Sequence, residues 1–177
     1  NKTKMTYNQM EQLTELTDAL DGKTQYTYNE LGYPIQVTDA NGNVTKMTYT
    51  TTAQLEEVTL PDGTTVRQEY DALDRLIKQT HSSGLVTEYS YDAANRVVNK
   101  KDNQNLNETY TYDQAGNRLT LTNSLGEVTQ YSYNSDNQLT KVVYADKTSE
   151  AFTYDVMGNV ASSTDQEGKT KTYHYDQ

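Results

Sequence analysis

Nine tyrosines recur in this chain at an unbroken interval of 21 residues. They are Tyr7, Tyr28, Tyr49, Tyr70, Tyr91, Tyr112, Tyr133, Tyr154 and Tyr175. Self-similarity at a fixed period is typical of repeat architectures, in which each unit packs on its neighbours in the chain. The 177 residues therefore contain about eight copies of one small structural unit.

Each copy of the repeat predicts two short strands. Residues 24–28 alternate, so that Tyr26 and Tyr28 share one face of a strand and Thr27 takes the other. The residue after the tyrosine is Asp or Asn in eight of nine copies, and such a side chain can bond the backbone ahead of it and open a turn. A second strand follows, for example residues 34–38. Each copy is thus strand, turn, strand, turn.

Small or flexible residues punctuate both turns. Gly32, Gly116 and Gly158 stand four residues after their tyrosines, where a tight turn needs the left-handed conformation. Asn41-Gly42 is a strong hairpin signal. The centres predicted for the second turn are Gly22, Gly42, Gly63, Gly84, Asn105, Gly126, Lys147 and Gly168.

The aliphatic residue that opens the second strand shifts in two copies. Ile35 and Leu119 lie seven residues after their tyrosines, whereas the other six aliphatic residues lie six after. The 21-residue period is nevertheless kept. This pattern predicts a first turn that is one residue longer in these two repeats, with the second connection absorbing the difference.

The fold class predicted from this repeat is all-β. Tandem 21-residue β-hairpins should form a long curved antiparallel sheet, an open spiral or partial β-shell, because wide twisted sheets curl. The tyrosines should stack in ladders on alternate strands. Residues 1–177 are interpreted as a single repeat array and as a fragment of a larger protein, and its open strand edges suggest edge-to-edge self-association.

The composition excludes several classes of partner. The formal net charge of −10 and a pI near 4.6 disfavour binding to nucleic acid or to anionic lipid surfaces. No apolar run is long enough to insert into a membrane. Cysteine is absent, so neither a disulfide framework nor a cysteine-based zinc site is expected.

No set of residues predicts catalysis. His81 and His174 are the only histidines, and neither belongs to a converging group of the kind that metal and triad sites need. The repeat spreads its carboxylates evenly instead of pairing them in one cleft. We therefore expect no catalytic, cofactor or metal site and no enzyme activity. The Asp and Asn residues that follow the tyrosines are interpreted as turn caps in preference to calcium ligands.

The stretches 91–97, 112–119 and 154–160, each opening on Tyr-Asp, resemble the YD repeat of Rhs proteins. The same repeat occurs in bacterial wall-associated proteins, in shell subunits of insecticidal Tc toxins and in teneurins. The resemblance implies a β-sheet that spirals into a hollow shell around a C-terminal toxin, in secreted or cell-surface proteins. The block associated with self-cleavage in that family has no counterpart in this sequence.

Two functions follow as hypotheses. The first is a structural scaffold, part of the shell of a secreted bacterial protein that encloses or presents a passenger domain of the same polypeptide, with flanking repeats as its other partners. The second is a carbohydrate- or cell-wall-binding module that uses the tyrosines to contact glycans. Burial of the tyrosine rings between repeats would argue against the second hypothesis.

Overall fold

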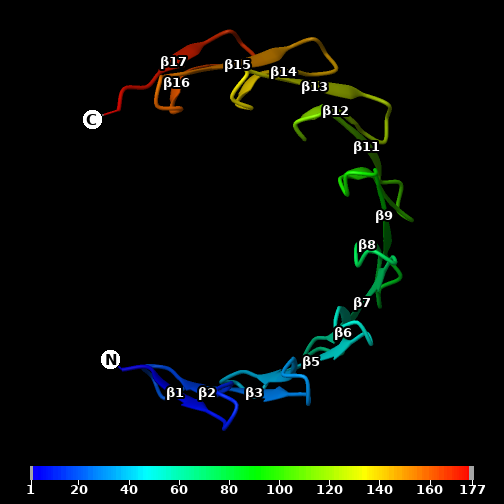
Figure 1. Cartoon of the computed structure of the whole chain (residues 1–177), viewed down its shortest axis with the longest axis vertical. Helices are drawn as coiled ribbons and strands as arrows, with labels where there is room; N and C mark the ends of the chain where they lie inside the picture. The colour runs from blue at the N-terminus through cyan, green and yellow to red at the C-terminus, as the bar shows by residue number, and fades with distance from the viewer. Residues whose placement is uncertain (1, 176–177) are drawn as a thin grey trace. The chain divides into compact units, whose positions relative to one another are not determined.

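The computed structural model describes residues 2–175, which form 17 strands joined by short turns (Figure 1). The chain divides into two compact units, one reaching to Thr87 and one starting at Glu88. The strands of the first unit are β1 (Lys4–Tyr7), β2 (Leu13–Thr17), β3 (Lys23–Tyr28), β4 (Pro34–Thr38), β5 (Val44–Tyr49), β6 (Leu55–Thr59), β7 (Thr65–Tyr70) and β8 (Leu76–His81). Strand β9 (Val86–Tyr91) contains the division, and β10 (Val97–Asp102), β11 (Asn107–Tyr112), β12 (Arg118–Thr122), β13 (Val128–Tyr133), β14 (Leu139–Val143), β15 (Ser149–Tyr154), β16 (Val160–Thr164) and β17 (Thr170–Thr172) follow.

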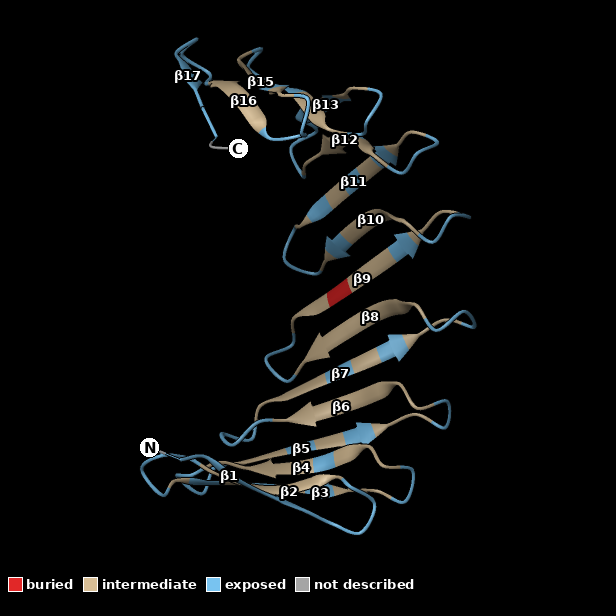
Figure 2. Cartoon of the chain, turned by 60° about the vertical axis from the view of Figure 1, so that its left-hand side comes forward, coloured by how far each residue is buried: buried red, intermediate tan, exposed pale blue. Residues whose placement is uncertain are grey.

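Each unit is an antiparallel meander. Strands pair with the strands before and after them in chain order, as β2 does with β1 and β3, and β12 with β11 and β13. Figure 2 shows the strands of the first unit lying side by side, with their turns projecting at both edges. The predicted fold class, tandem 21-residue hairpins in an open antiparallel sheet, is confirmed.

A β-bulge sets the face on which the side chains lie. In the first hairpin Thr6 opposes Glu15 and Tyr7 opposes Leu13, so the register shifts by one residue just before the turn. The same shift recurs in the hairpins whose first strand ends on Tyr28, Tyr49 or Tyr70. It is also present in the second unit, in the hairpins that begin with β11, β13 and β15. The residue six positions after each tyrosine consequently lies directly opposite that tyrosine, on the tyrosine-bearing face.

Both kinds of turn have one hydrogen-bonding pattern. In the first turn of the first repeat, Asn8 N–H donates to the Gln12 carbonyl, and Glu11 N–H donates to the Asn8 carbonyl. The Asn8 side-chain oxygen also accepts hydrogen bonds from the backbone N–H of Met10 and of Gln12, at 2.9 and 3.0 Å. Asp18 organises the second turn in the same way. This is a type I turn closed by a left-handed residue, a common hairpin connection.

The prediction of a longer first turn before Ile35 and Leu119 is wrong. Asn29 N–H bonds the Tyr33 carbonyl, so this turn has the same length as the others, and Pro34 lies opposite Tyr28 as Leu13 lies opposite Tyr7. The capped turn has a fixed length, so the sequence shift is accommodated in the strand. Ile35 and Leu119 therefore occupy the bulge, where they are 37% and 39% exposed.

The second turn of the first repeat is also centred differently from the prediction. The left-handed residue is Asp21, with φ of 64°, and Gly22 is the residue that closes the turn. Asp18 caps this turn, and the fourth residue of a capped turn takes the left-handed conformation whatever its type. The left-handed positions of the second turns are accordingly Asp21, Gly42, Gly63, Gly84, Asn105, Gly126, Lys147 and Gly168.

The sheet has almost no enclosed core. Among the described residues, Val142 is the one buried apolar side chain, at 6% exposed, and Thr87 is the one buried polar residue, at 8%. The tyrosine-bearing face is instead half-buried, as the alternating exposure along β3, β11 and β13 shows. Packing is therefore confined to one layer, with contacts between neighbouring strands.

Replacing Ala53 with glycine should stabilise the first unit by about 0.5–1 kcal/mol, because Ala53 holds a left-handed conformation with φ of 70°. Ala40→Gly is the control, since Ala40 lies in a turn at a position without positive φ and should lose stability on substitution. Urea unfolding followed by circular dichroism measures both changes. A loss of stability in Ala53→Gly would contradict the expectation.

Candidate functional site: the tyrosine hydroxyls and the contacts between turns

Seven of the recurring tyrosines join their repeat to the one before it. Each of their hydroxyls donates a hydrogen bond to the backbone carbonyl 15 residues earlier, at the first residue of the adjacent strand. The bonds run from Tyr28 to Leu13 (2.7 Å), Tyr49 to Pro34 (2.8 Å), Tyr70 to Leu55 (2.9 Å), Tyr112 to Val97 (2.8 Å), Tyr133 to Arg118 (3.1 Å), Tyr154 to Leu139 (2.7 Å) and Tyr175 to Val160 (3.1 Å).

These hydroxyls complete the pairing between hairpins. Strands β2 and β3 pair from Glu15 opposite Gln25 to Thr17 opposite Lys23, next to the second turn. Leu13, at the other end of β2, lies beyond these pairs, and its carbonyl receives the Tyr28 hydroxyl. Backbone carbonyls need a hydrogen-bond partner. Adjacent hairpins are thus held by backbone bonds at one edge and by a tyrosine side chain at the other.

The recurring tyrosines lie on alternate strands, with one strand between those of successive repeats. Their stacking into ladders stays a prediction, and one tyrosine ring pair in the structure joins Tyr33 to Tyr49, at 5.2 Å between centroids. Tyr7 ends β1 and is 54% exposed, with its hydroxyl 3.2 Å from the Met5 sulfur. Tyr91 ends β9 and is half-buried.

The three predicted glycines lie in the first turns with left-handed φ angles of 88°, 95° and 86° for Gly32, Gly116 and Gly158. At two of them the previous repeat also approaches closely. The side-chain amide of Gln12 donates to the Gly32 carbonyl at 3.3 Å, and a Cβ at Gly32 would meet it at 3.0 Å. Gln138 is placed in the same way at Gly158. Gly32 and Gly158 therefore allow neighbouring turns to touch.

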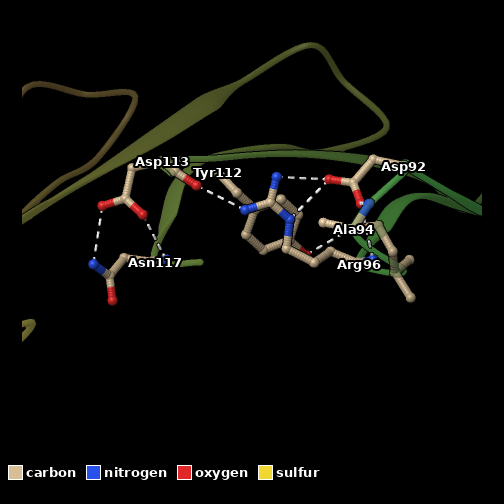
Figure 3. Close-up of polar contacts among 7 residues, drawn as sticks. Asp92, Ala94, Arg96, Tyr112, Asp113 and Asn117 are labelled. Carbon is tan, nitrogen blue, oxygen red and sulfur yellow. Dashed lines mark hydrogen bonds and ion pairs between the residues drawn. The ribbon is translucent and has the colours of Figure 1, made fainter. Parts of the chain in front are cut away.

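Arg96 makes several contacts between turns (Figure 3). Its Nε donates to Asp92 Oδ2 at 2.8 Å, and its Nη2 lies 2.7 Å from the same carboxylate. Its Nη1 donates to the backbone carbonyl of Asp113 at 2.7 Å, in the next turn. The guanidinium also lies over the Tyr112 ring, 4.7 Å from its centroid. One side chain thus ties two successive turns and a tyrosine together.

The residue five positions after the tyrosine can also contact the next turn, and this role was not predicted from the sequence. Asn117 holds this position, and its amide donates to the Asn137 side-chain oxygen at 2.8 Å in the next turn. The signal is present in the sequence, because every residue at this position carries a hydrogen-bonding side chain. The residues are Gln12, Tyr33, Gln54, Arg75, Arg96, Asn117, Gln138 and Asn159.

Two of the turn carboxylates, Asp92 and Asp155, have depressed pKa values because each accepts several hydrogen bonds. The backbone and then the side chain of Arg96 lower the pKa of Asp92, and those of Asn159 lower the pKa of Asp155. The pKa of Tyr110 shifts in the opposite direction. Burial, followed by its hydrogen bond to Glu108 at 2.6 Å, raises the pKa of Tyr110 to about 12. All of these shifts follow from structural hydrogen bonds and packing.

The lowered pKa values of the aspartates predict a loss of stability in acid. A group with a folded-state pKa below its unfolded value of 3.8 stabilises the fold fully above that value, and the stabilisation is lost as the pH falls through the folded-state pKa. We expect the urea midpoint to drop below about pH 4 relative to pH 5. The drop should be smaller in Asp92→Asn/Asp155→Asn, whose amides still accept hydrogen bonds. An equal drop in this variant would assign the acid sensitivity to other groups.

The remaining candidate groups among the described residues include the two histidines and a surface hollow. His81 ends β8 and His174 follows β17, and no group of three or more His, Asp or Glu side chains in residues 2–175 could hold a metal ion. A shallow hollow of about 380 Å³ is lined by Met10, Tyr26, Glu30 and their neighbours. No helix among the described residues has the length and apolarity needed to cross a membrane.

Family models identify the repeat. The RHS Repeat model matches residues 70–105, 91–128, 112–149 and 133–170, which together cover more than half of the chain. The chain belongs to the RHS-repeat family. The Teneurin YD-shell model matches residues 1–83. The tyrosine-to-carbonyl bonds are therefore contacts between successive RHS repeats, and their regular recurrence is that of a structural element.

Solved Tc toxin structures share the fold. A crystal structure of TcdB2-TccC3-Cdc42 superposes with a TM-score of 0.71 at 22% identity, over 85% of this chain and 10% of that chain. The Photorhabdus luminescens Tc holotoxin pore, with the mutation TccC3-D651A, superposes with a TM-score of 0.68 at 22% identity, over 80% of this chain and 9% of that chain. This RHS-repeat chain thus spans about a tenth of the length of these neighbours. No curated protein matches it.

Proposed function

We propose that this chain is a scaffold segment of a β-shell that encloses or presents a toxin or another passenger domain of the same polypeptide. One observation carries the proposal. The sheet is a single layer with one buried apolar residue among those described, so it builds a wall and not a closed core of its own. Seven tyrosine hydroxyls tie their repeats to the preceding ones, and the side chains of Gln12, Arg96, Asn117 and Gln138 reach the next turn. Such contacts between neighbours suit a wall that is extended by adding repeats.

The structural neighbours support this role. They are a Tc holotoxin and a TcdB2-TccC3 complex solved both with and without a hypervariable C-terminal region. A shell fold that occurs in complexes with a separable C-terminal region favours a passenger in the present case. The role also includes three narrower proposals: the chain is not an enzyme, it is secreted or displayed on a bacterial surface, and its two units are consecutive parts of one array.

Glycan binding through the repeating tyrosines is not favoured. Seven of these tyrosines use their hydroxyls to bond backbone carbonyls, and the rings of Tyr28, Tyr112 and Tyr133 are half-buried. A ring that stacks on a sugar needs an open face. The hydrogen bonds of these hydroxyls support a role of the tyrosines in joining repeats.

Two measurements test the proposed function. In a polypeptide that carries these repeats together with a passenger domain, the passenger should resist protease, and a variant with Val142→Asp should expose it. A passenger digested equally fast in both proteins would count against a shell. The second measurement is a glycan array with this chain and its Tyr110→Ser/Tyr112→Ser variant. Selective binding that disappears in a still-folded variant would replace the scaffold with a recognition module.

A further inference from the structure

One edge of the first unit carries a row of exposed apolar side chains at its turn tips. Met10, Leu31 and Leu73 are the third residues of the turns that follow β1, β3 and β7, and they are 72%, 76% and 66% exposed. Thr52 holds the same position after β5. The turns between β5 and β6 and between β7 and β8 project together from this edge, at the right in Figure 2. We call Met10, Leu31, Thr52 and Leu73 the tip row.

The turns do not require apolar tips. The backbone N–H of Met10, Leu31 and Leu73 donates a hydrogen bond to the side-chain oxygen of the capping residue, whereas their side chains are exposed. The second turns of the same unit have the same geometry, and three of their four third residues are polar. These third residues are Leu20, Asn41, Asp62 and Ser83. Three of the four tip positions are thus apolar on this edge and one of four on the other, so apolar tips are concentrated on one edge, and exposed apolar groups that gather on one surface mark interaction sites.

Carboxylates flank the tip row. Glu11 and Asp74 follow the tips of the first and fourth turns, Glu30 precedes the tip of the second, and all three are exposed. The ion pairs among the described residues of the first unit use other carboxylates, namely those of Glu15, Glu56, Glu69 and Asp71. The tip row therefore presents apolar groups within an acidic rim, and its partner should be apolar with a basic rim.

The spacing of the tip row matches a helix. Tips of adjacent first turns are two strands apart, about 10 Å at the usual strand separation. Residues seven apart on an α-helix are separated by about 10.5 Å along its axis. A helix lying along the edge could thus place successive heptad residues on Met10, Leu31, Thr52 and Leu73, with Lys or Arg side chains beside the carboxylates.

We propose that the tip row is a docking surface for a basic amphipathic helix with an apolar residue at every seventh position. Charge complementarity distinguishes this partner from the two others that an apolar row could take. A second copy of this edge would bring Glu11, Glu30 and Asp74 against like charges. An anionic lipid surface would be repelled by the same carboxylates.

The test uses the full chain and a synthetic helical peptide of about four heptads, with Leu at every seventh position and Lys on the flanking positions. Binding is measured by fluorescence anisotropy. Leu31→Asp/Leu73→Asp should weaken binding at least tenfold, because Asp removes both apolar contacts at sites where the turn tolerates polar residues. Leu20→Asp is the matched control, since Leu20 is 90% exposed at the same turn position on the other edge, and it should leave binding unchanged.

Three results of the binding measurement would overturn the proposal, and a fourth comes from sedimentation. Equal binding of a peptide with Glu in place of Lys would remove the electrostatic argument. Equal weakening by Leu20→Asp would show that the edge is not selective, and an absence of binding by the unsubstituted chain would dismiss the helix. Sedimentation of the chain alone provides the remaining comparison. Concentration-dependent association that disappears in Leu31→Asp/Leu73→Asp would assign the tip row to a second copy instead.

Discussion

Replacing Tyr112 with alanine should lower the free energy of unfolding of the second unit by about 3–4 kcal/mol. The substitution removes a half-buried ring and the hydroxyl that bonds the Val97 carbonyl at 2.8 Å. It also removes the surface over which the Arg96 guanidinium lies at 4.7 Å. Because a single-layer sheet has no core to compensate, the ring and hydroxyl of one tyrosine provide a large part of what joins two repeats. Chemical denaturation followed by circular dichroism measures the change.

Tyr112→Phe separates the two contributions of this residue. Phenylalanine keeps the ring and its packing against Arg96 but leaves the Val97 carbonyl without its donor, which should cost about 1 kcal/mol. Ser90→Ala, at an exposed position in the same unit, is the control and should be nearly neutral. If Tyr112→Ala cost no more than Tyr112→Phe, the ring would contribute nothing to the packing of repeats, and the structural role of the tyrosines would have to be abandoned.

Replacing Val142 with aspartate should unfold much of the second unit, with a loss of about 3 kcal/mol or more. Val142 is 6% exposed and lies opposite Tyr131 on the neighbouring strand, so the new carboxylate would be placed against an aromatic ring without a partner. Val142→Ala should cost about 2 kcal/mol, because it removes buried methyl groups without introducing a charge.

The control for Val142 is Val128→Asp, because Val128 is 37% exposed in β13 and its substitution should cost far less. Hydrogen exchange of the backbone amides locates the damage. Protection should fall first in β13 and β14, which pair through Tyr131 and Val142. Full retention of protection in Val142→Asp would mean that burial at this position does not stabilise the hairpin.

The repeat and its local structure follow from the amino-acid sequence alone. The 21-residue period, the alternation in residues 24–28 and the Asp or Asn cap after the tyrosine all act within a few residues, and the strands and turns follow from them. Gly32, Gly116 and Gly158 are predictable as left-handed residues for the same reason, because the conformation of a capped turn is set by its own five residues. That no residue set supports catalysis is likewise an expectation from the sequence.

The contacts between one repeat and the next depend on how the strands pair in the folded protein. The bulge before each tyrosine assigns Pro34 and Arg118 to the tyrosine-bearing face and puts Ile35 and Leu119 in the bulge, which a count of residues from the tyrosine does not reveal. The acceptor of seven of the tyrosine hydroxyls is a carbonyl 15 residues earlier, and its identity depends on the register between hairpins. The position of Arg96 against Asp113 depends on the same register. Such interactions follow from the pairing of strands, so a pattern along one chain indicates the residues involved but not their partners.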